Sequence, residues 1–256
     1  MVHNDERAAY ERDGFVVVRQ LLPADEFATL RAALDRYVRE IVPTLPPSDA
    51  FYEDPSLPAS LKQMQRLAQW DPYFADYAHH PRWRALAELL IGEEARSDGP
   101  EWFNKPPSLS RMTPPHQDNF YFNLKPSNVA TLWMAIDPVD AENGALRYVP
   151  GSHLRGFRPH QRTDVVGFSQ GINDFTDAER EHSVEVHLDP GDVVAHHGMT
   201  IHSAEPNRSK TRQRRAFAMV FKGVSCRRDE AGYSRYLESL REQHQSMGLA
   251  GSKARE

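Results

Sequence analysis

The chain has 256 residues, 39% of them hydrophobic and 26% charged, and its formal net charge is -5 at pH 7. This length can bury a large core, and we expect a single domain over residues 1–256. The mild negative charge disfavours nucleic acid as a partner, and the single cysteine, Cys226, excludes an internal disulfide and a cysteine metal cage. The polar N-terminal residues, and the lack of any run of about 20 apolar residues, predict a cytoplasmic protein with no membrane contact.

The first part of the chain, about residues 1–100, is predicted to be rich in helix. Residues 23–42 carry apolar side chains at helical spacing, with Pro23 and acidic residues at the start. The other predicted elements of this part are a helix over 5–14 that is closed by Gly14, a strand over 15–22, an extended proline-rich surface loop over 43–60, and two helical pieces over 71–92 that divide at Pro81.

From about residue 101 to residue 225 the pattern changes to short strands separated by turns. Runs of β-branched and apolar residues alternate with turn sequences such as ENG, PGS and DPGD. The predicted strands lie within residues 129–139, 145–152, 183–197 and 215–224. Helices ahead of a β-rich half predict a mainly β fold with flanking α-helices, either a sheet sandwich or a jelly roll.

Two further segments complete this division of the chain. Residues 154–181 are long, polar and weakly periodic, which is typical of an active-site lid or rim. A C-terminal helix and tail are expected over about residues 228–256, with 248–256 poorly ordered.

The stretch PPHQDNFYF, residues 114–122, places a histidine and an aspartate two residues apart among strand-forming residues. In a regular strand His116 and Asp118 would project from the same face, while Gln117 would point away. Such a pair can occupy two positions around one metal ion. An isolated pair at this spacing is more often a histidine and an unrelated aspartate, so a third ligand is needed to support the hypothesis.

A histidine from a distant strand would complete a set of two histidines and one carboxylate, which suits non-haem Fe(II) oxygenases. We choose His202, which follows the DPGDVV segment and precedes a basic cluster. His196 and His197 compete for this role, although they lie in the strand before the turn. Taken alone, each of the three is equally well explained as a hydrogen-bonded structural histidine.

Several motifs in their order along the chain resemble the phytanoyl-CoA dioxygenase family of iron- and 2-oxoglutarate-dependent oxygenases. These motifs are FNKPP, PPHQDNFYF, LWMAIDPVDAENGALRYVPGSH and DPGDVVAHHGMTIHSAEPNRS followed by RRAFAMVF. The resemblance implies a double-stranded β-helix, or cupin-like jelly roll, with Fe(II) at its mouth. It also implies that His116, Asp118 and His202 are both the metal ligands and the catalytic centre.

The same resemblance implies that an arginine entering the strand after the last histidine binds the distal carboxylate of 2-oxoglutarate. Arg214 matches best, although a shift of register would transfer the role to Arg212 or Arg215. A planar guanidinium can hold a carboxylate through two parallel hydrogen bonds, which a lysine cannot do. Without the motif context, RSKTRQRR would be read as a solvated basic turn.

Other residues are implied to lie near 2-oxoglutarate. Trp133 corresponds to a tryptophan that lines the cosubstrate pocket, and Lys62 to a basic residue that some members use. Family members often carry a hydroxyl two residues after the final histidine. Here that position is Ala204, and Ser203 is the candidate replacement.

Four more residues are weaker candidates for contacts near the metal. Arg147 and His153 belong to a stretch that is better explained as scaffold turns. In a regular strand, Asn119 and Tyr121 would share a face with each other and not with the metal pair.

The implied reaction consumes O2 and 2-oxoglutarate, releases succinate and CO2, and hydroxylates an unactivated C–H bond of a small-molecule substrate. Relatives that halogenate replace the carboxylate ligand by a small residue, so the presence of Asp118 favours hydroxylation.

Two other interpretations stay open: a metal-binding jelly roll that acts as a hydrolase or isomerase without 2-oxoglutarate, and a non-catalytic binding module. The first would leave Arg214 without a purpose. The sequence does not decide the oligomeric state or choose among acyl-CoA, amino-acid derivatives, phosphonates and secondary metabolites, although the absence of an obvious basic pocket for CoA favours a small metabolite.

Overall fold

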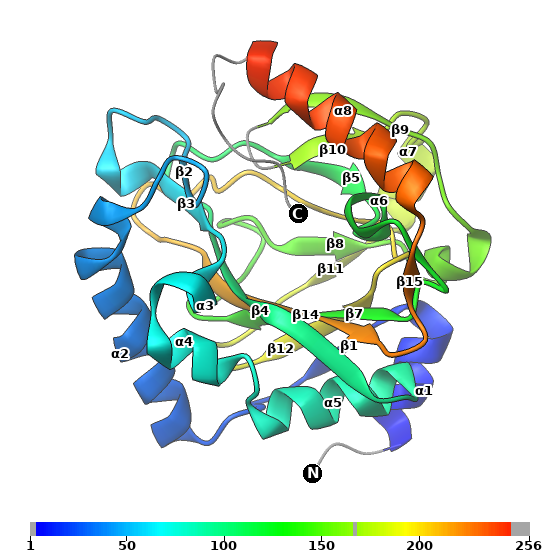
Figure 1. Cartoon of the computed structure of the whole chain (residues 1–256), viewed down its shortest axis with the longest axis horizontal. Helices are drawn as coiled ribbons and strands as arrows, with labels where there is room; N and C mark the ends of the chain where they lie inside the picture. The colour runs from blue at the N-terminus through cyan, green and yellow to red at the C-terminus, as the bar shows by residue number, and fades with distance from the viewer. Residues whose placement is uncertain (1–3, 166–167, 247–256) are drawn as a thin grey trace.

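Figure 1 shows the computed structural model, which describes residues 4–165 and 168–246. Two antiparallel sheets of seven and four strands face each other as in a jelly roll, with two smaller two-stranded ribbons beside them. Most helices belong to the N-terminal part and the last described helix lies at the C-terminal end. The predicted class, mainly β with flanking helices, is confirmed.

The larger sheet has helices on one face and the smaller sheet on the other. Side chains alternate across a strand, so Phe217, Met219 and Phe221 pack toward the helices while Ala216 and Ala218 face the space between the sheets. In spatial order its strands are β1 (Phe15–Val18), β12 (Val193–His197), β7 (Val129–Ala135), β14 (Arg215–Gly223), β4 (Ala95–Asn104), β3 (Leu61–Met64) and β2 (Ala50–Tyr52).

Two of the predicted metal ligands lie in the smaller sheet, one in its edge strand and one in the neighbouring strand. Its strands, in spatial order, are β11 (Val184–Val186), β8 (Leu146–Tyr148), β13 (His202–Ala204) and β5 (Thr113–His116). The ribbons pair β10 (Phe168–Ile172) with β9 (His160–Val165), and β15 (Arg227–Arg228) with β6 (Leu124–Lys125).

The N-terminal helices cover the outer face of the larger sheet. Helix α2 (Ala24–Glu40) begins after Pro23 as predicted and buries Leu30, Leu34 and Tyr37 in the core that contains Phe217. The other helices are α1 (Asn4–Asp13), α3 (Leu67–Trp70), α4 (Pro72–Tyr77), α5 (Pro81–Ile91), α6 (Asn119–Phe122), α7 (Asp177–His182) and α8 (Glu230–Ser246), with short 3-10 turns at Val42–Thr44, Pro58–Ser60 and Ser152–Arg155. Helix α8 packs on α6 through an aromatic cluster.

Three predicted elements differ from the structure. The strand over 15–22 ends at Val18, where Asp192 binds the backbone N–H of Gln20 and starts a turn. The predicted surface loop over 43–60 contains β2, whose pairing with β3 extends the larger sheet. The polar segment 154–181, predicted as an active-site lid or rim without regular structure of its own, contains the β9–β10 hairpin and most of α7. Polar hairpins of this kind lack the apolar alternation that identifies a strand.

Two remaining expectations concern the chain ends and the membrane. The tail 248–256 lies outside the described residues. Among the helices that the structure describes, none is both long enough and apolar enough to cross a bilayer.

Candidate metal centre

The three predicted metal ligands meet at the end of the smaller sheet. His116 is the last residue of β5 and His202 the first of β13, and the two residues are paired across these antiparallel strands. Asp118 follows His116 by two residues. One potential ligand atom from each of the three lies within 4.8 Å of the other two. A spacing of this size allows one metal ion to bind all three side chains.

Asp118 reaches this point by a different backbone path from the predicted one. Strand β5 ends at His116, and Asp118 has φ -58 and ψ -34, the helical conformation that leads into α6. The strand argument for the two ligands was therefore wrong, although both side chains point to one place. Gln117 points away as expected, and its amide donates to the carbonyls of Gly156 and Met199 at 3.0 and 2.8 Å.

Hydrogen bonds fix the tautomer of both histidines. His116 Nδ1 lies 2.8 Å from the carbonyl oxygen of Pro114, and His202 Nδ1 lies 3.0 Å from that of Thr200. A carbonyl can only accept, so each Nδ1 carries the hydrogen and each Nε2 presents a lone pair. Neutral imidazoles in this state are ready to bind a metal ion.

The two oxygens of the Asp118 carboxylate face different partners. Oδ1 lies 3.5 Å from His116 Nε2 and 3.6 Å from His202 Nε2, at the centre of the cluster. Oδ2 accepts a 2.7 Å hydrogen bond from the hydroxyl of Thr131 and lies 3.1 Å from His196 Nε2. The carboxylate is therefore held so that one oxygen remains for a metal ion.

His196 supports the site through Asp118, and His197 lies further away. His196 Nε2 donates to the carboxylate, so its Nδ1 is the acceptor for the Tyr148 hydroxyl at 3.0 Å. The Nδ1 of His197 accepts from the backbone N–H of Met199 at 3.0 Å. Of the competing histidines, this geometry favours His202 as the third ligand.

The cluster has a strong electrostatic bias toward an ionised carboxylate. Burial would raise the pKa of Asp118, but the neighbouring His202, His116 and His196 outweigh it and hold that pKa well below its usual value. Burial, with His116 and His196 close by, keeps the pKa of His202 well below its usual value. An ionised carboxylate beside imidazole nitrogens is the donor set that a divalent cation requires.

The three candidate arginines differ in their partners. Arg212 pairs with Asp140 at 2.7 Å and Arg215 with Asp137 at 2.8 Å. Arg214 is 5% exposed, and among the described residues no carboxylate lies within ion-pair distance of it and its Nε has no hydrogen-bond partner. Burial lowers the pKa of Arg214 to about 10, which leaves it charged at neutral pH.

Three other residues were predicted to lie near 2-oxoglutarate: Trp133, Lys62 and Ser203. The Arg214 guanidinium carbon lies 5.0 Å from the Trp133 ring centroid, so the tryptophan supports the cation from one side. Lys62 is buried and pairs with Glu53 at 2.9 Å. Ser203 follows His202 in β13, and strand alternation directs its side chain to the opposite face of the sheet.

Lys105 in the FNKPP motif is a buried cation that the sequence reasoning did not single out. Its Nζ donates to the carbonyl of Arg111 at 2.6 Å. Burial, together with the neighbouring charges of Arg214 and Lys62, keeps the pKa of Lys105 well below its usual value. The available signal was a lysine between Phe103 and two prolines in a motif that carried the family resemblance.

The weaker candidates have structural contacts instead. Arg147 is bound to Ser183 and Glu185 on the outer side of the smaller sheet. His153 Nε2 lies 3.1 Å from the carbonyl oxygen of Glu11. Asn119 binds the backbone of Leu124 within the turn after α6.

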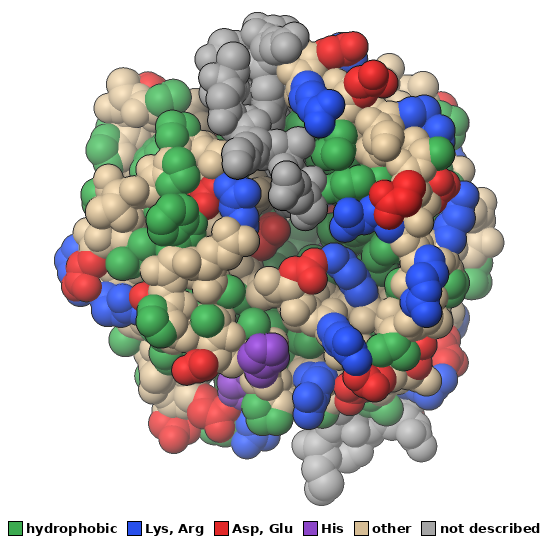
Figure 2. Space-filling model, in the orientation of Figure 1, with side chains coloured by type: hydrophobic (Ala, Val, Ile, Leu, Met, Phe, Trp, Pro, Cys, Tyr) green, Lys and Arg blue, Asp and Glu red, His purple; other side chains and the backbone are tan. Residues whose placement is uncertain are grey.

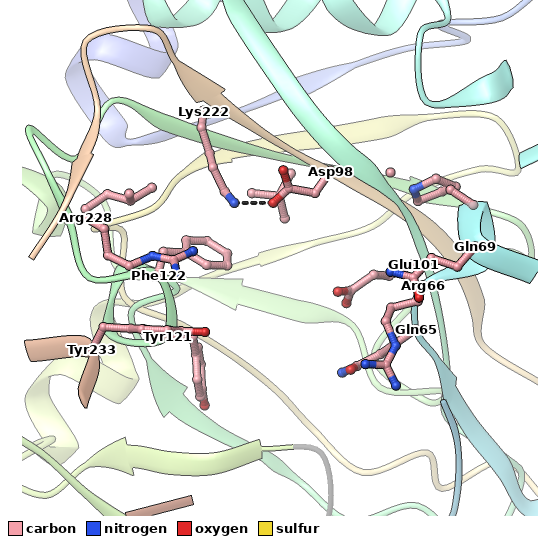
Figure 3. A pocket seen from close by; sticks show the side chains of 15 residues that line it. Gln65, Arg66, Gln69, Asp98, Glu101, Tyr121, Phe122, Lys222, Arg228 and Tyr233 are labelled. Atoms are coloured by element: carbon pink, nitrogen blue, oxygen red, sulfur yellow. Dashed lines mark hydrogen bonds and ion pairs between the residues drawn. The ribbon is translucent and has the colours of Figure 1, made fainter. Parts of the chain in front are cut away.

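Tyr121 connects the triad to a cavity of about 420 Å³. Its ring makes an edge contact with His116 at a centroid distance of 5.9 Å and also lines the cavity. Figure 3 shows Tyr121, Phe122, Lys222, Arg228 and Tyr233 on one side of this cavity and Gln65, Arg66, Gln69 and Glu101 on the other. In the orientation of Figure 1, this face of the molecule is hollowed near its centre, and charged side chains of both signs surround the hollow (Figure 2).

In this jelly roll, two histidines and one aspartate meet at the end of a sheet. The arrangement defines the class of protein: a jelly-roll protein with a candidate site for a single metal ion. The chain belongs to the phytanoyl-CoA dioxygenase (PhyH) family, whose profile matches residues 10–216. The peroxisomal phytanoyl-CoA dioxygenase of Mus musculus is 29% identical over 239 residues, which cover 87% of this chain and 69% of that protein. The Rattus norvegicus protein is 28% identical, with 80% and 64% covered, so this chain spans about two thirds of the length of these relatives.

Solved structures with the same fold include enzymes of nogalamycin biosynthesis. The epimerase SnoN, in complex with Fe3+, alpha ketoglutarate and nogalamycin RO, has a TM-score of 0.69 and 27% identity, with 87% of this chain and 84% of that chain covered. The alpha ketoglutarate dependent carbocyclase SnoK has a TM-score of 0.70 and 24% identity, with 91% and 90% covered. Together with the sheet topology, these likenesses confirm the predicted jelly roll.

Proposed function

We propose that the chain is an Fe(II)- and 2-oxoglutarate-dependent dioxygenase that hydroxylates an unactivated C–H bond of a small molecule. One atom of O2 enters the substrate and the other enters succinate, with release of CO2. Membership of the family supports the enzyme class, and the similarity to SnoN, a protein solved with iron and alpha ketoglutarate, supports the cofactors.

The observation that carries this proposal is the buried guanidinium of Arg214, whose Nε has no hydrogen-bond partner and which forms no ion pair with any carboxylate of the described residues. A buried charge without a partner is unfavourable by several kcal/mol, on the order of the desolvation penalty for one ion. An arriving carboxylate would remove this penalty and could accept two parallel hydrogen bonds. The distal carboxylate of 2-oxoglutarate is such a group, whereas a hydrolase or isomerase that works without it would leave Arg214 unexplained.

The donor set fits Fe(II). Two neutral imidazole nitrogens and one carboxylate on one side of a metal ion leave positions for the keto acid and O2, which is the arrangement of non-haem Fe(II) oxygenases. His116, Asp118 and His202 would hold the ion. When bound, iron and 2-oxoglutarate supply the oxidising power for the C–H bond.

The chain's own residues then have distinct roles in this proposal. Thr131 and His196 orient the Asp118 carboxylate, and Trp133 supports the guanidinium of Arg214. Tyr121 contacts His116 and lines the cavity, where the substrate would be positioned. Lys62 is also proposed to contribute positive charge near the cosubstrate, although Glu53 already neutralises it.

Hydroxylation is the finer part of the proposal. Asp118 occupies the position at which halogenating relatives have a small residue, which favours oxygen insertion over halogenation. SnoN is an epimerase and SnoK a carbocyclase, so epimerisation or ring closure without oxygen insertion is the competing outcome. We also keep the prediction of a cytoplasmic location, although the named relatives are peroxisomal.

The test is a screen for substrate-stimulated formation of succinate under Fe(II), 2-oxoglutarate and O2. We expect one class of small molecule to raise the rate, with a product heavier by one oxygen atom in mass spectrometry. Asp118→Ala is the control variant and is expected to remain folded and form no product. Product formation by Asp118→Ala at the wild-type rate would refute the assigned triad, and product formation without 2-oxoglutarate would refute the cosubstrate.

A further inference from the structure

The cavity next to the triad has a composition that limits its ligand. It is lined by five charged side chains, two glutamines and three aromatic rings. A volume of about 420 Å³ is typical of a site for one small molecule, since such pockets hold on the order of 300–1,000 Å³. This lining is unsuited to a long aliphatic chain, because that chain would desolvate the charged groups without replacing their hydrogen bonds.

The cavity lies close enough to the triad to hold a substrate for it. Tyr121 contacts His116 and lines the cavity, as described above. From the other side, Val220 lines the cavity and is paired across the sheet with Thr131, whose hydroxyl binds Asp118. A molecule in the cavity is therefore adjacent to the residues that orient the metal ligands.

The three cations that line the cavity are not equivalent. Arg66, on the cavity wall opposite Arg228, pairs with Asp49 (Figure 3). Lys222 pairs with Asp98, which also lines the cavity (Figure 3). Arg228 has no ion pair with any carboxylate of the described residues, and its guanidinium carbon lies 4.2 Å from the ring centroid of Tyr233. It is the cation of this cavity whose charge is not already matched.

Arg228 is also held in place before any ligand arrives. Its backbone pairs with Leu124 in the β15–β6 ribbon. The next residue, Asp229, binds Lys125 at 2.8 Å and accepts from the N–H of Gly232 at the start of α8. Arg228 is exposed at the wall of the cavity, and stacking on Tyr233 favours one orientation of the guanidinium plane, which reduces the side-chain entropy lost when its edge binds a planar or tetrahedral oxyanion.

We propose that the substrate is a small polar molecule that carries an oxyanion, a carboxylate or a phosphate, and that Arg228 binds this group at the cavity wall that it shares with Tyr121, Phe122 and Tyr233 (Figure 3). The inference rests on the proposed function, because it treats the cavity as the substrate site of that reaction. The aromatic wall of Tyr121, Phe122 and Tyr233 would contact the body of the molecule, and the glutamines its other polar groups. Specificity would come from the anionic group, because a neutral analogue leaves the guanidinium without its partner.

The experiment uses matched probes with the full chain, loaded with Zn(II) in place of Fe(II) and saturated with 2-oxoglutarate. Phenylacetate, phenyl phosphate and the neutral phenylacetamide are titrated by isothermal calorimetry. At least one of the two anions should bind about tenfold tighter than the amide, since hydrogen bonds to charged groups are worth at least one factor of ten. Which anion binds more tightly distinguishes a carboxylate substrate from a phosphate substrate.

Variants assign the preference to one residue. Arg228→Gln should remove the anion preference and Arg228→Lys should restore part of it. Arg227→Gln should keep it, because the Arg227 guanidinium binds the backbone carbonyls of Val224 and Cys226 outside the cavity. Equal or absent binding of anions and amide by the wild type, or a preference that survives in Arg228→Gln, would overturn the proposal.

The two proposals fail in different ways. Binding of 2-oxoglutarate to the Fe(II) protein does not involve Arg228, so its affinity should be the same in Arg228→Gln as in the wild type. A protein that binds no 2-oxoglutarate but keeps an Arg228-dependent anion preference would refute the oxygenase and retain the anion site. Normal 2-oxoglutarate binding without any anion preference would do the reverse.

Discussion

Replacing Thr131 by valine tests whether the orientation of Asp118 matters for metal binding. Valine has nearly the same shape and suits a buried strand, so the substitution removes mainly the 2.7 Å hydrogen bond to Asp118 Oδ2. A hydrogen bond to a charged group is worth about 1.5–3 kcal/mol, which corresponds to roughly tenfold to a hundredfold in affinity. His196 still donates to the same oxygen, so we expect a loss near the lower limit, about tenfold, in Fe(II) affinity.

The assay is an anaerobic competition between the protein and a chromogenic Fe(II) chelator, with circular dichroism as a check on folding. Thr131→Ser is the matched control, because it keeps the hydroxyl and should bind Fe(II) within about twofold of the wild type. Wild-type affinity in Thr131→Val, or equal losses in the valine and serine variants, would show that the hydrogen bond does not orient a metal ligand.

Two further predictions concern the remaining histidines and the stability of the fold. In the same competition assay, His202→Ala should lose Fe(II) binding and His197→Ala should keep it. His196→Ala should weaken Fe(II) binding by about tenfold to a hundredfold. Greater retention of Fe(II) in His202→Ala than in His197→Ala would mean that the wrong third ligand was chosen. Asp192→Asn should lower the free energy of unfolding by about 1.5–3 kcal/mol near neutral pH, because the buried carboxylate accepts from Arg19 and from nearby backbone N–H groups. Burial raises the pKa of Asp192, but these donors outweigh it and lower that pKa below its unfolded value. The difference in the free energy of unfolding between wild type and variant is therefore fully present above pH ~4 and shrinks as the pH falls below that value. Urea unfolding at pH 7 and at pH 3 measures this difference, and equal values at the two pH values would contradict the prediction.

Local patterns in the sequence were sufficient for α1, α2, α4, α5 and α8 and for most strands of the larger sheet, but not for α3, α6 and α7. Helix α2 has a regular apolar stripe, and the division at Pro81 follows from the missing N–H of proline. The apolar run of β7 is buried on both faces, so its continuous hydrophobicity identified it. Strand β2 was missed because three residues among prolines give no detectable period.

The candidate site was predicted through motif resemblance more than through local geometry. The assumption of a continuous strand through Asp118 was wrong, since the chain turns into α6 directly after His116 and Gln117. The residue types at this spacing carried the resemblance, and the turn still brings both ligands together. The backbone conformation of such a turn depends on contacts with Met199 and Gly156, which are distant in sequence.

Contacts between distant segments account for what the sequence reasoning could not supply. Thr131 and Tyr148 occur in ordinary strand sequences, and only the pairing of β7 and β8 with their neighbours brings them to Asp118 and His196. Arg228 stands beside another arginine in a short polar segment. Its difference from that neighbour lies entirely in what surrounds each guanidinium.

The binding of 2-oxoglutarate to Arg214 is the most direct test of the proposed function. The keto acid is titrated into the anaerobic Fe(II) protein, and the visible absorption of the chelate is followed for the wild type, Arg214→Ala, Arg214→Lys and the matched control Arg215→Ala, whose guanidinium is already paired with Asp137. We predict that Arg214→Ala keeps Fe(II) but loses at least about tenfold in 2-oxoglutarate affinity, because a buried carboxylate that loses a charged partner costs about 2–5 kcal/mol. Arg214→Lys should recover part of the loss and Arg215→Ala should bind like the wild type. Unchanged affinity in Arg214→Ala, or a larger loss in Arg215→Ala, would contradict the assignment of the cosubstrate to Arg214.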